Sequence, residues 1–159
     1  MSFGRGGGDV FAISALAIKV FVAYQDAPEN YRHISEEVAG LQVLLGTVEK
    51  YFKSSAISSN DRQNCQRVLK GCQSVLEDLN SLIEKYSSLA STDKRLVFKR
   101  VKLGKEDIIT IRQRLISNTV LLSGFVRRFV ILFNSFDFRN SVKANISTLA
   151  VNILKFRHG

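Results

Sequence analysis

The sequence predicts an all-α protein, a single bundle of four long helices with a shorter helix at its C-terminal end. Apolar residues recur every three or four positions through most of the 159 residues, which is the period of an α-helix. The chain has one proline, and four of its ten glycines lie within the first eight residues, so helix-breaking residues are scarce elsewhere. A domain of this size buries about two thirds of its unfolded surface, enough for a core of its own.

The first helix is expected over residues 9–25, after a glycine-rich and flexible segment at 1–8. Asp9 is a suitable N-cap, and Lys19 is the only charge that follows before residue 26. One stripe repeats in threes and fours: Val10, Ile13, Ala17, Val20 and Tyr24. Five further residues make the helix apolar almost all round: Phe11, Leu16, Ile18, Phe21 and Val22. About sixteen residues fall short of the roughly twenty of a transmembrane span.

The second and third helices are amphipathic. After the break at residues 26–28, the second carries Tyr31, Ile34, Val38, Leu41, Leu45, Val48 and Phe52. After a polar stretch at 54–60, the third carries Cys65, Val68, Cys72, Val75, Leu79, Leu82, Tyr86 and Leu89. Its two cysteines are about 10 Å apart along one helix face, too far for a disulfide, so we interpret them as reduced core thiols.

Residues 94–105 form a basic linker between the third and fourth helices, with the bases Lys94, Arg95, Lys99, Arg100, Lys102 and Lys105. Glu106 and Asp107 then favour a helix N-terminus. The expected apolar face of the fourth helix is Ile108, Ile111, Leu115, Asn118, Leu122, Phe125, Phe129, Leu132 and Phe136, with Arg127 and Arg128 on the solvent side. The segment 142–156 is either a fifth helix or a continuation, and the short connections favour antiparallel neighbours.

The charge of the chain is uneven. Residues 1–89 hold 9 basic and 10 acidic side chains, whereas residues 90–159 hold 14 and 4, so the second half carries the net charge of +9. This asymmetry favours attraction to an anionic surface, either lipid head groups or nucleic acid, over simple solubility of a basic face.

The sequence offers no recognisable catalytic or metal-binding group. Its two histidines, His33 and His158, are far apart in sequence, and nothing pairs Glu36, Glu37 or Asp61 with a nucleophile. The glycine-rich start lacks the Lys-Ser/Thr of a phosphate-binding loop. We therefore expect no enzymatic activity, no metal and no cofactor.

Several blocks resemble the HeLo-like family, the fungal N-terminal domain of STAND (NOD-like) receptor proteins. These blocks are residues 2–4, 8–11, 26–28 and 34–38, then 71–72 with 75–76 and Leu79, and 106–108 with Arg112, Arg114, Leu115, Ile116, Asn118, 121–122 and Phe125. The resemblance covers about residues 1–130. It departs at residues 101–103, where family members often carry a tryptophan, and residues 140–157 match no block.

The resemblance implies a bundle related to the HeLo domain and to that of the mixed-lineage-kinase-like necroptosis executioner. It implies a toxin of programmed cell death in fungal innate immunity and heterokaryon incompatibility: a cytoplasmic domain that permeabilises the plasma membrane once it oligomerises. A STAND receptor or an amyloid signalling motif would cluster it. The membrane-insertion candidates are Val10, Phe11, Ile13, Leu16, Ile18, Val20 and Phe21, and the bases of residues 94–105 are candidates for anionic lipid.

Two other interpretations stay open at this point. The bundle is alternatively a non-lytic module that recruits partners for a receptor, with its first helix simply a buried core helix. Nucleic-acid binding by the basic half is the third interpretation. We do not expect it, because the aromatics of that half have helical spacing and are interpreted as core rather than stacking platforms: Phe125, Phe129, Phe133, Phe136 and Phe138.

Overall fold

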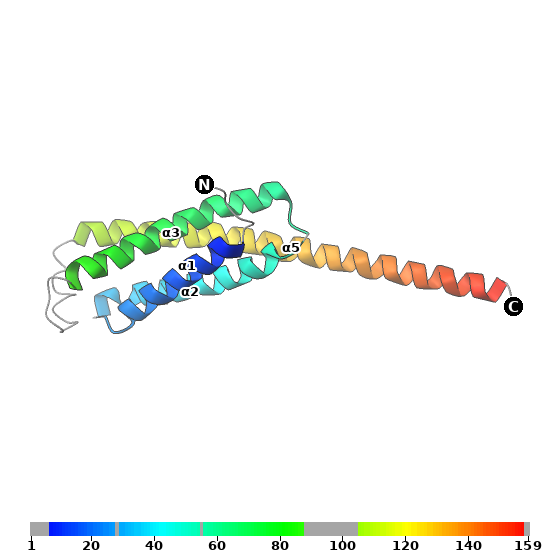
Figure 1. The fold of residues 1–159 in the computed structure, drawn as a ribbon, viewed down its shortest axis with the longest axis horizontal. Helices are drawn as coiled ribbons and strands as arrows, with labels where there is room; N and C mark the ends of the chain where they lie inside the picture. Colours follow the sequence, from blue (N-terminus) through cyan, green and yellow to red (C-terminus); the bar gives the residue numbers. More distant parts are fainter. Residues whose placement is uncertain (1–6, 28, 55, 88–104, 158–159) are drawn as a thin grey trace.

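The computed structural model confirms the all-α fold class. It describes residues 7–27, 29–54, 56–87 and 105–157. Within these ranges the elements are four helices and no strand: α1 (Gly7–Gln25), α2 (Glu29–Phe52), α3 (Ser59–Ser87) and α5 (Lys105–Arg157). They pack as an elongated bundle from which the C-terminal part of α5 projects (Figure 1).

The order of the helices around the bundle follows from their contacts. α1 packs chiefly against α2 and less extensively against α3, and α5 packs against α2 and α3. α1 and α5 therefore lie diagonally across the bundle. The outward faces of these two helices consequently point to opposite sides of the molecule.

Each helix contributes one stripe to a single core, largely as the periodicity predicts. All seven apolar positions predicted for α2 are buried, as are the five predicted for α1. α3 buries both cysteines together with Leu69, Val75, Leu76 and Leu79, and α5 buries residues spaced seven apart: Ile108, Leu115, Leu122 and Phe129. Burial of apolar surface, at roughly 25 cal/mol per Å², is the main stabilisation of such a bundle.

The connection between α2 and α3 is fixed by the N-cap residue Ser58 and by an arginine. The Asp61 amide donates to Ser58 Oγ (3.1 Å), and Ser58 Oγ donates to Asp61 Oδ2 (2.7 Å). Arg62 donates to the last carbonyl of α2, at Phe52 (2.7 Å), and its guanidinium lies 4.9 Å from the centre of the Phe52 ring. This turn thus satisfies donors and acceptors that both helix ends leave free.

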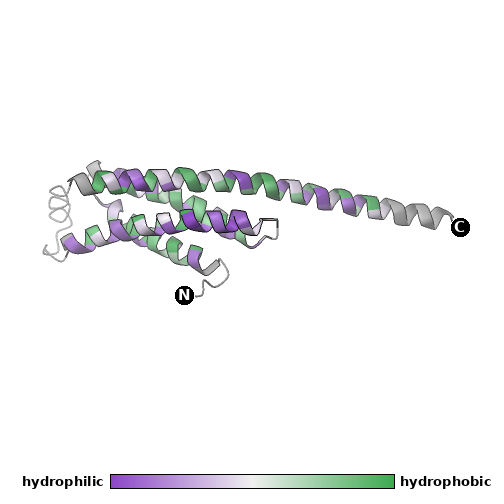
Figure 2. Ribbon diagram, turned by 90° about the horizontal axis from the view of Figure 1, so that it is seen from above, coloured by the Kyte–Doolittle hydropathy of each residue, from purple (hydrophilic) through white to green (hydrophobic). Residues whose placement is uncertain are grey.

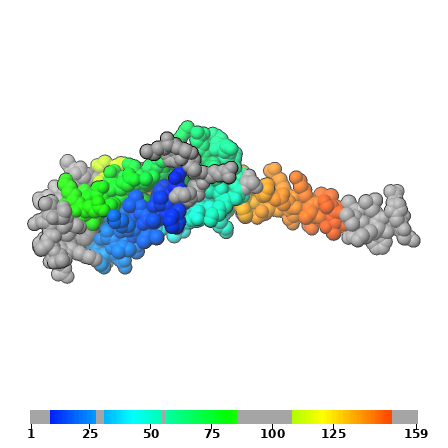
Figure 3. All heavy atoms as spheres, in the orientation of Figure 1, coloured from blue at the N-terminus to red at the C-terminus, as the bar shows by residue number. Residues whose placement is uncertain are grey.

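The segment 142–156 is not a separate fifth helix but the continuation of α5. Asn140 and Ser141, which we interpreted as a cap pair, lie inside the helix. No proline or glycine stands between residues 125 and 157 to end it. The 53 residues of α5 extend over about 80 Å, and its described side chains from 134 to 148 are all exposed. Figure 3 shows this part leaving the body of the molecule as a single rod.

Candidate functional site

His33 and Asp61, which the sequence offered as candidate polar residues, contact neighbouring side chains within the bundle. His33 is exposed, with its Nδ1 3.6 Å from Glu36 on the same helix. Asp61 belongs to the cap of α3 and pairs with Arg128 at 3.2 Å. Among the described residues, no three His, Cys, Asp or Glu side chains group closely enough to hold a metal ion.

The two cysteines are packing residues. Cys65 and Cys72 are free thiols buried in the core. Burial disfavours the thiolate and raises the pKa of each from 9.0 to about 12. A thiol with such a raised pKa is neutral at physiological pH and a poor nucleophile.

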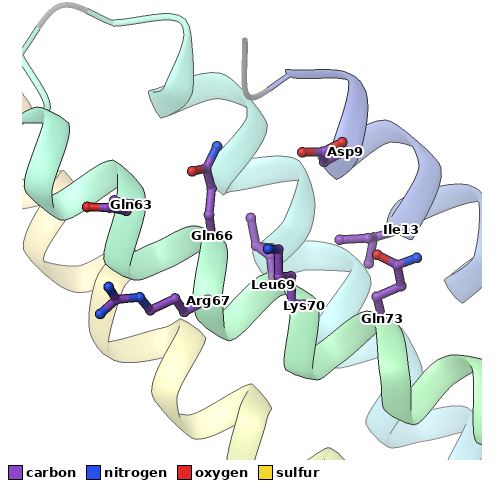
Figure 4. Close-up of a pocket in the computed structure, with 8 residues that line it drawn as sticks. All are labelled: Asp9, Ile13, Gln63, Gln66, Arg67, Leu69, Lys70 and Gln73. Atoms are coloured by element: carbon purple, nitrogen blue, oxygen red, sulfur yellow. The ribbon is translucent and has the colours of Figure 1, made fainter. Parts of the chain in front are cut away.

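A groove separates the start of α1 from the first half of α3 (Figure 4). Its volume is about 340 Å³, and Figure 4 shows side chains of both helices along it: Asp9, Ile13, Gln63, Gln66, Arg67, Leu69, Lys70 and Gln73. Six of its eight lining residues are polar, and the other two, Ile13 and Leu69, are core residues that lie at its base.

α1 is apolar on two faces. Its inner face fills the core. Its outer face exposes Phe11 (68%), Ile18 (56%) and Val22 (54%), which are spaced seven and four residues apart and share one side of the helix. In most amphipathic helices this side is polar, so α1 presents an apolar surface to solvent that the core does not need.

The described polar contacts between α1 and α3 are weak. Tyr24 Oη donates to the Leu79 carbonyl of α3 (3.2 Å), and Lys19 Nζ lies 2.9 Å from Glu84 Oε1. Lys19 lowers the pKa of the Glu84 carboxyl below its usual value by donating a hydrogen bond to it. Both members of this ion pair are more than half exposed, and exposed pairs contribute about 0–1 kcal/mol.

α5 is joined to α2 and α3 by arginine ion pairs. Arg112 donates to Glu37 Oε1 of α2 through Nε (2.8 Å) and Nη2 (2.6 Å). Arg114 binds Asp78 Oδ2 of α3 (2.6 Å), and Arg128 pairs with Asp61 in the cap of α3. The Glu37 side chain is 21% exposed, and desolvated pairs of this kind are costly to break.

The structure divides the seven membrane-insertion candidates by their position on α1. Val10, Ile13 and Val20 are buried in the core, and Leu16 and Phe21 are partly buried against it. Phe11 and Ile18 lie on the outer face, to which the structure adds Val22. The anionic-lipid candidates Lys94, Arg95, Lys99, Arg100 and Lys102 lie outside the described residues, and α5 begins at Lys105.

Like α1, α5 carries an exposed apolar face in addition to its buried one. The spacing of the core residues of α5 did not predict this face. Its larger members are Ile109, Ile116, Val120, Leu121, Ile131, Phe138, Val142 and Ile146. Among the described residues, the stretch Ile108–Thr148 is long and apolar enough to cross a membrane, by length and composition, and 17% of its most apolar window is buried. Core helices that pass the same test are mostly buried.

Two of the five aromatics expected in the core are not there. Phe129 is buried, and Phe125 packs partly buried against it, with Tyr51 and Phe133 alongside. Phe136 and Phe138 are exposed because α5 has passed the ends of α2 and α3 at that point. The prediction that all five are core residues was wrong for these two.

Compared with family models, with curated proteins and with solved structures, the chain gives no match. The structural clues to its function are therefore the fold and the two exposed apolar helix faces.

Proposed function

We propose that this chain is a membrane-permeabilising effector domain, a toxin of programmed cell death, whose α1 leaves the bundle and enters the plasma membrane after oligomerisation. The resting domain is cytoplasmic, and a STAND receptor or amyloid signalling motif clusters it, as the resemblance to the HeLo-like family implies. The observation that carries this proposal is that α1 is apolar on both faces, with Phe11, Ile18 and Val22 exposed.

For α1 by itself, the gain from burying its exposed side chains in lipid and the cost of burying Lys19 are of similar size. The inner face of α1 is in apolar surroundings in either location, so transfer to lipid mainly buries the exposed parts of the three outer side chains. That burial contributes about 3–5 kcal/mol. Placing Lys19 at the bilayer centre opposes it by about 2.5–3.5 kcal/mol. The apolar faces of α2 and α3 that α1 covers lose this cover when α1 leaves, and that cost holds the resting domain in its bundle. Clustering of several domains can then decide the outcome.

The length of α1 suits entry into a membrane rather than a full crossing. Its nineteen residues extend over about 28 Å, but the first three are Gly7, Gly8 and Asp9, so the apolar part is shorter than the roughly 30 Å of a hydrocarbon core. The contacts between α1 and α3 include a hydrogen bond from Tyr24 and an exposed ion pair from Lys19.

Dye release from anionic vesicles tests the proposal with a matched pair of variants. Deletion of residues 1–25 is a poor test because it removes five core residues. Ile18→Gln changes only the exposed face of α1, and Val43→Gln changes a still more exposed apolar residue (71%, against 56% for Ile18) on α2. We expect Ile18→Gln to reduce leakage by about tenfold and Val43→Gln to leave it unchanged. Equal leakage by both variants would refute an inserting α1.

The alternative function is a non-lytic module that recruits partners for a STAND receptor. The observation that favours it is the exposed apolar face of α5, which suits contact with another helix. This alternative predicts no leakage from vesicles even when the domain is artificially clustered. It also predicts that substitutions on the outer face of α1 leave the recruitment of partners unchanged.

A further inference from the structure

An eleven-residue repeat runs along the outward face of α5. Its members are Ile109, Val120, Ile131 and Val142, all β-branched and between 38% and 65% exposed. Eleven residues make close to three helical turns, so these side chains lie above one another on one face. The core residues of the same helix are instead spaced by seven. α5 therefore carries two apolar stripes with different periods on different sides.

In the projecting part of α5 the outward stripe becomes broader. Phe138 lies four residues before Val142 and Ile146 four residues after it, and they are 70% and 60% exposed. Together with Ile131, these residues form what we call the outer strip. Figure 2 shows hydrophobic and hydrophilic positions alternating along this projecting part, as an amphipathic helix requires.

Basic side chains flank the outer strip. Residues three or four positions apart are neighbours on a helix surface. Arg127 and Arg128 stand four and three residues before Ile131, Arg139 stands three before Val142, and Lys143 stands three before Ile146. Arg128 also pairs with Asp61 in the cap of α3, so its charge is partly balanced within the bundle.

The one acidic residue between 127 and 148 is placed differently. Asp137 is not three or four residues from any member of the strip, so it lies away from it. The strip thus combines exposed apolar side chains with positive charge along its edges and little negative charge.

We propose that the outer strip, from Ile131 to Ile146, docks on an anionic lipid surface with α5 lying in the plane of the membrane. An apolar face 5–10 Å deep in the interface with basic residues at its edges is how amphipathic helices bind membranes. Charge complementarity favours this occupant over a second copy of the chain. Two copies of the strip face to face would bring their basic edges together, and like charges across an interface are unfavourable.

The proposal rests on the proposed function in one respect, namely that a membrane is the target. It adds a second, separate membrane contact. Because α1 and α5 are diagonal, a bundle docked through α5 holds α1 on its far side. Docking and insertion therefore use different faces, and α1 has to leave the bundle to reach the membrane that α5 contacts.

Single tryptophans test the orientation, because the chain contains none of its own. Phe138→Trp reports from the strip, Asn140→Trp from the opposite, exposed face of α5, and Val43→Trp from α2. On vesicles of phosphatidylcholine with phosphatidylserine, we expect a blue shift and quenching by brominated lipid for Phe138→Trp alone. Shifts at both positions on α5 would indicate a helix that crosses the bilayer and would overturn in-plane docking. A shift in buffer that grows with protein concentration would indicate self-pairing and also overturn it.

Charge-removing variants test the basic edge by co-sedimentation with the same vesicles. Each basic residue near an anionic surface contributes about fivefold in affinity, so Arg139→Gln with Lys143→Gln should weaken binding about twenty-five-fold. Arg32→Gln with Lys50→Gln removes the same charge from exposed positions on α2 and should change binding by less than about fivefold. Equal losses in both pairs would show binding by net charge and contradict the proposal.

The two proposals fail in different ways. If the chain binds vesicles through α5 but never releases dye, the permeabilising function is wrong and the docking surface stands. If dye release is normal while the strip variants bind as the wild type does, the docking surface is wrong and the function stands.

Discussion

Replacing Tyr24 by phenylalanine weakens the attachment of α1 to α3 without making α1 more polar. The change removes a buried hydroxyl, which donates a hydrogen bond of 3.2 Å to the Leu79 carbonyl of α3. Such a hydrogen bond contributes about 0.5–1.5 kcal/mol. If opening of α1 limits membrane entry, Tyr24→Phe should raise the rate of dye release by about two- to tenfold. The lost hydrogen bond stabilises only the state in which α1 is packed in the bundle.

The control for this prediction is a variant with a similar loss of stability away from α1. Ile108→Val on α5 removes one buried methylene and costs about 0.5–1.5 kcal/mol. Chemical denaturation measures both losses, and vesicle leakage is compared at equal protein concentration. We expect Tyr24→Phe to leak faster than Ile108→Val. If both leak equally, global unfolding rather than the opening of α1 explains the effect, and the reasoning is refuted.

Three further predictions concern the bundle itself. Gly71→Val should lower stability by about 0.5–1.5 kcal/mol in thermal denaturation, because a Cβ at this position would lie 2.5 Å from Asn118 Oδ1 and the Asn118 amide would have to leave its hydrogen bond to the Arg114 carbonyl. Arg112→Met should cost about 2–3 kcal/mol, since it leaves the largely buried Glu37 carboxylate without its partner, and adding Glu37→Met should recover most of that loss. Both core cysteines should resist a thiol reagent at pH 8 until the chain is unfolded. Because burial raises the pKa of both thiols from 9.0 to about 12, their contribution to stability is complete below pH 9 and should be lost as the pH rises from there through 12.

The helices and most of the core were predictable from the spacing of apolar residues. In α2 the alternation is regular and polar residues fill the other face, so all seven predicted positions are buried. In α1 the core stripe was also correct. The sequence did not show that Phe11, Ile18 and Val22 stay exposed, because a helix that is apolar all round is also typical of a helix buried on every side.

The larger error of the sequence-based prediction concerns the projecting part of α5, where Phe136 and Phe138 were expected in the core. Phe136 continues the seven-residue spacing of the core stripe. The local sequence does not show that α5 extends beyond the end of α2 and the start of α3 at this point. Asn140 and Ser141 are equally compatible with a cap and with a helix interior, so the continuation over 142–156 was open. The eleven-residue repeat of the outward stripe was present in the sequence, but it became visible only when the exposed side of the helix was known.

The most direct test of an inserting α1 is to tether it to the bundle. Lys19 and Glu84 face each other across α1 and α3 with their charged atoms 2.9 Å apart, and both are exposed. Lys19→Cys with Glu84→Cys can be joined by a short cleavable bis-maleimide, while the native cysteines are protected by burial. The account predicts that the tethered domain binds anionic vesicles without releasing dye, and that cleaving the linker restores release. Full release by the tethered domain would contradict it.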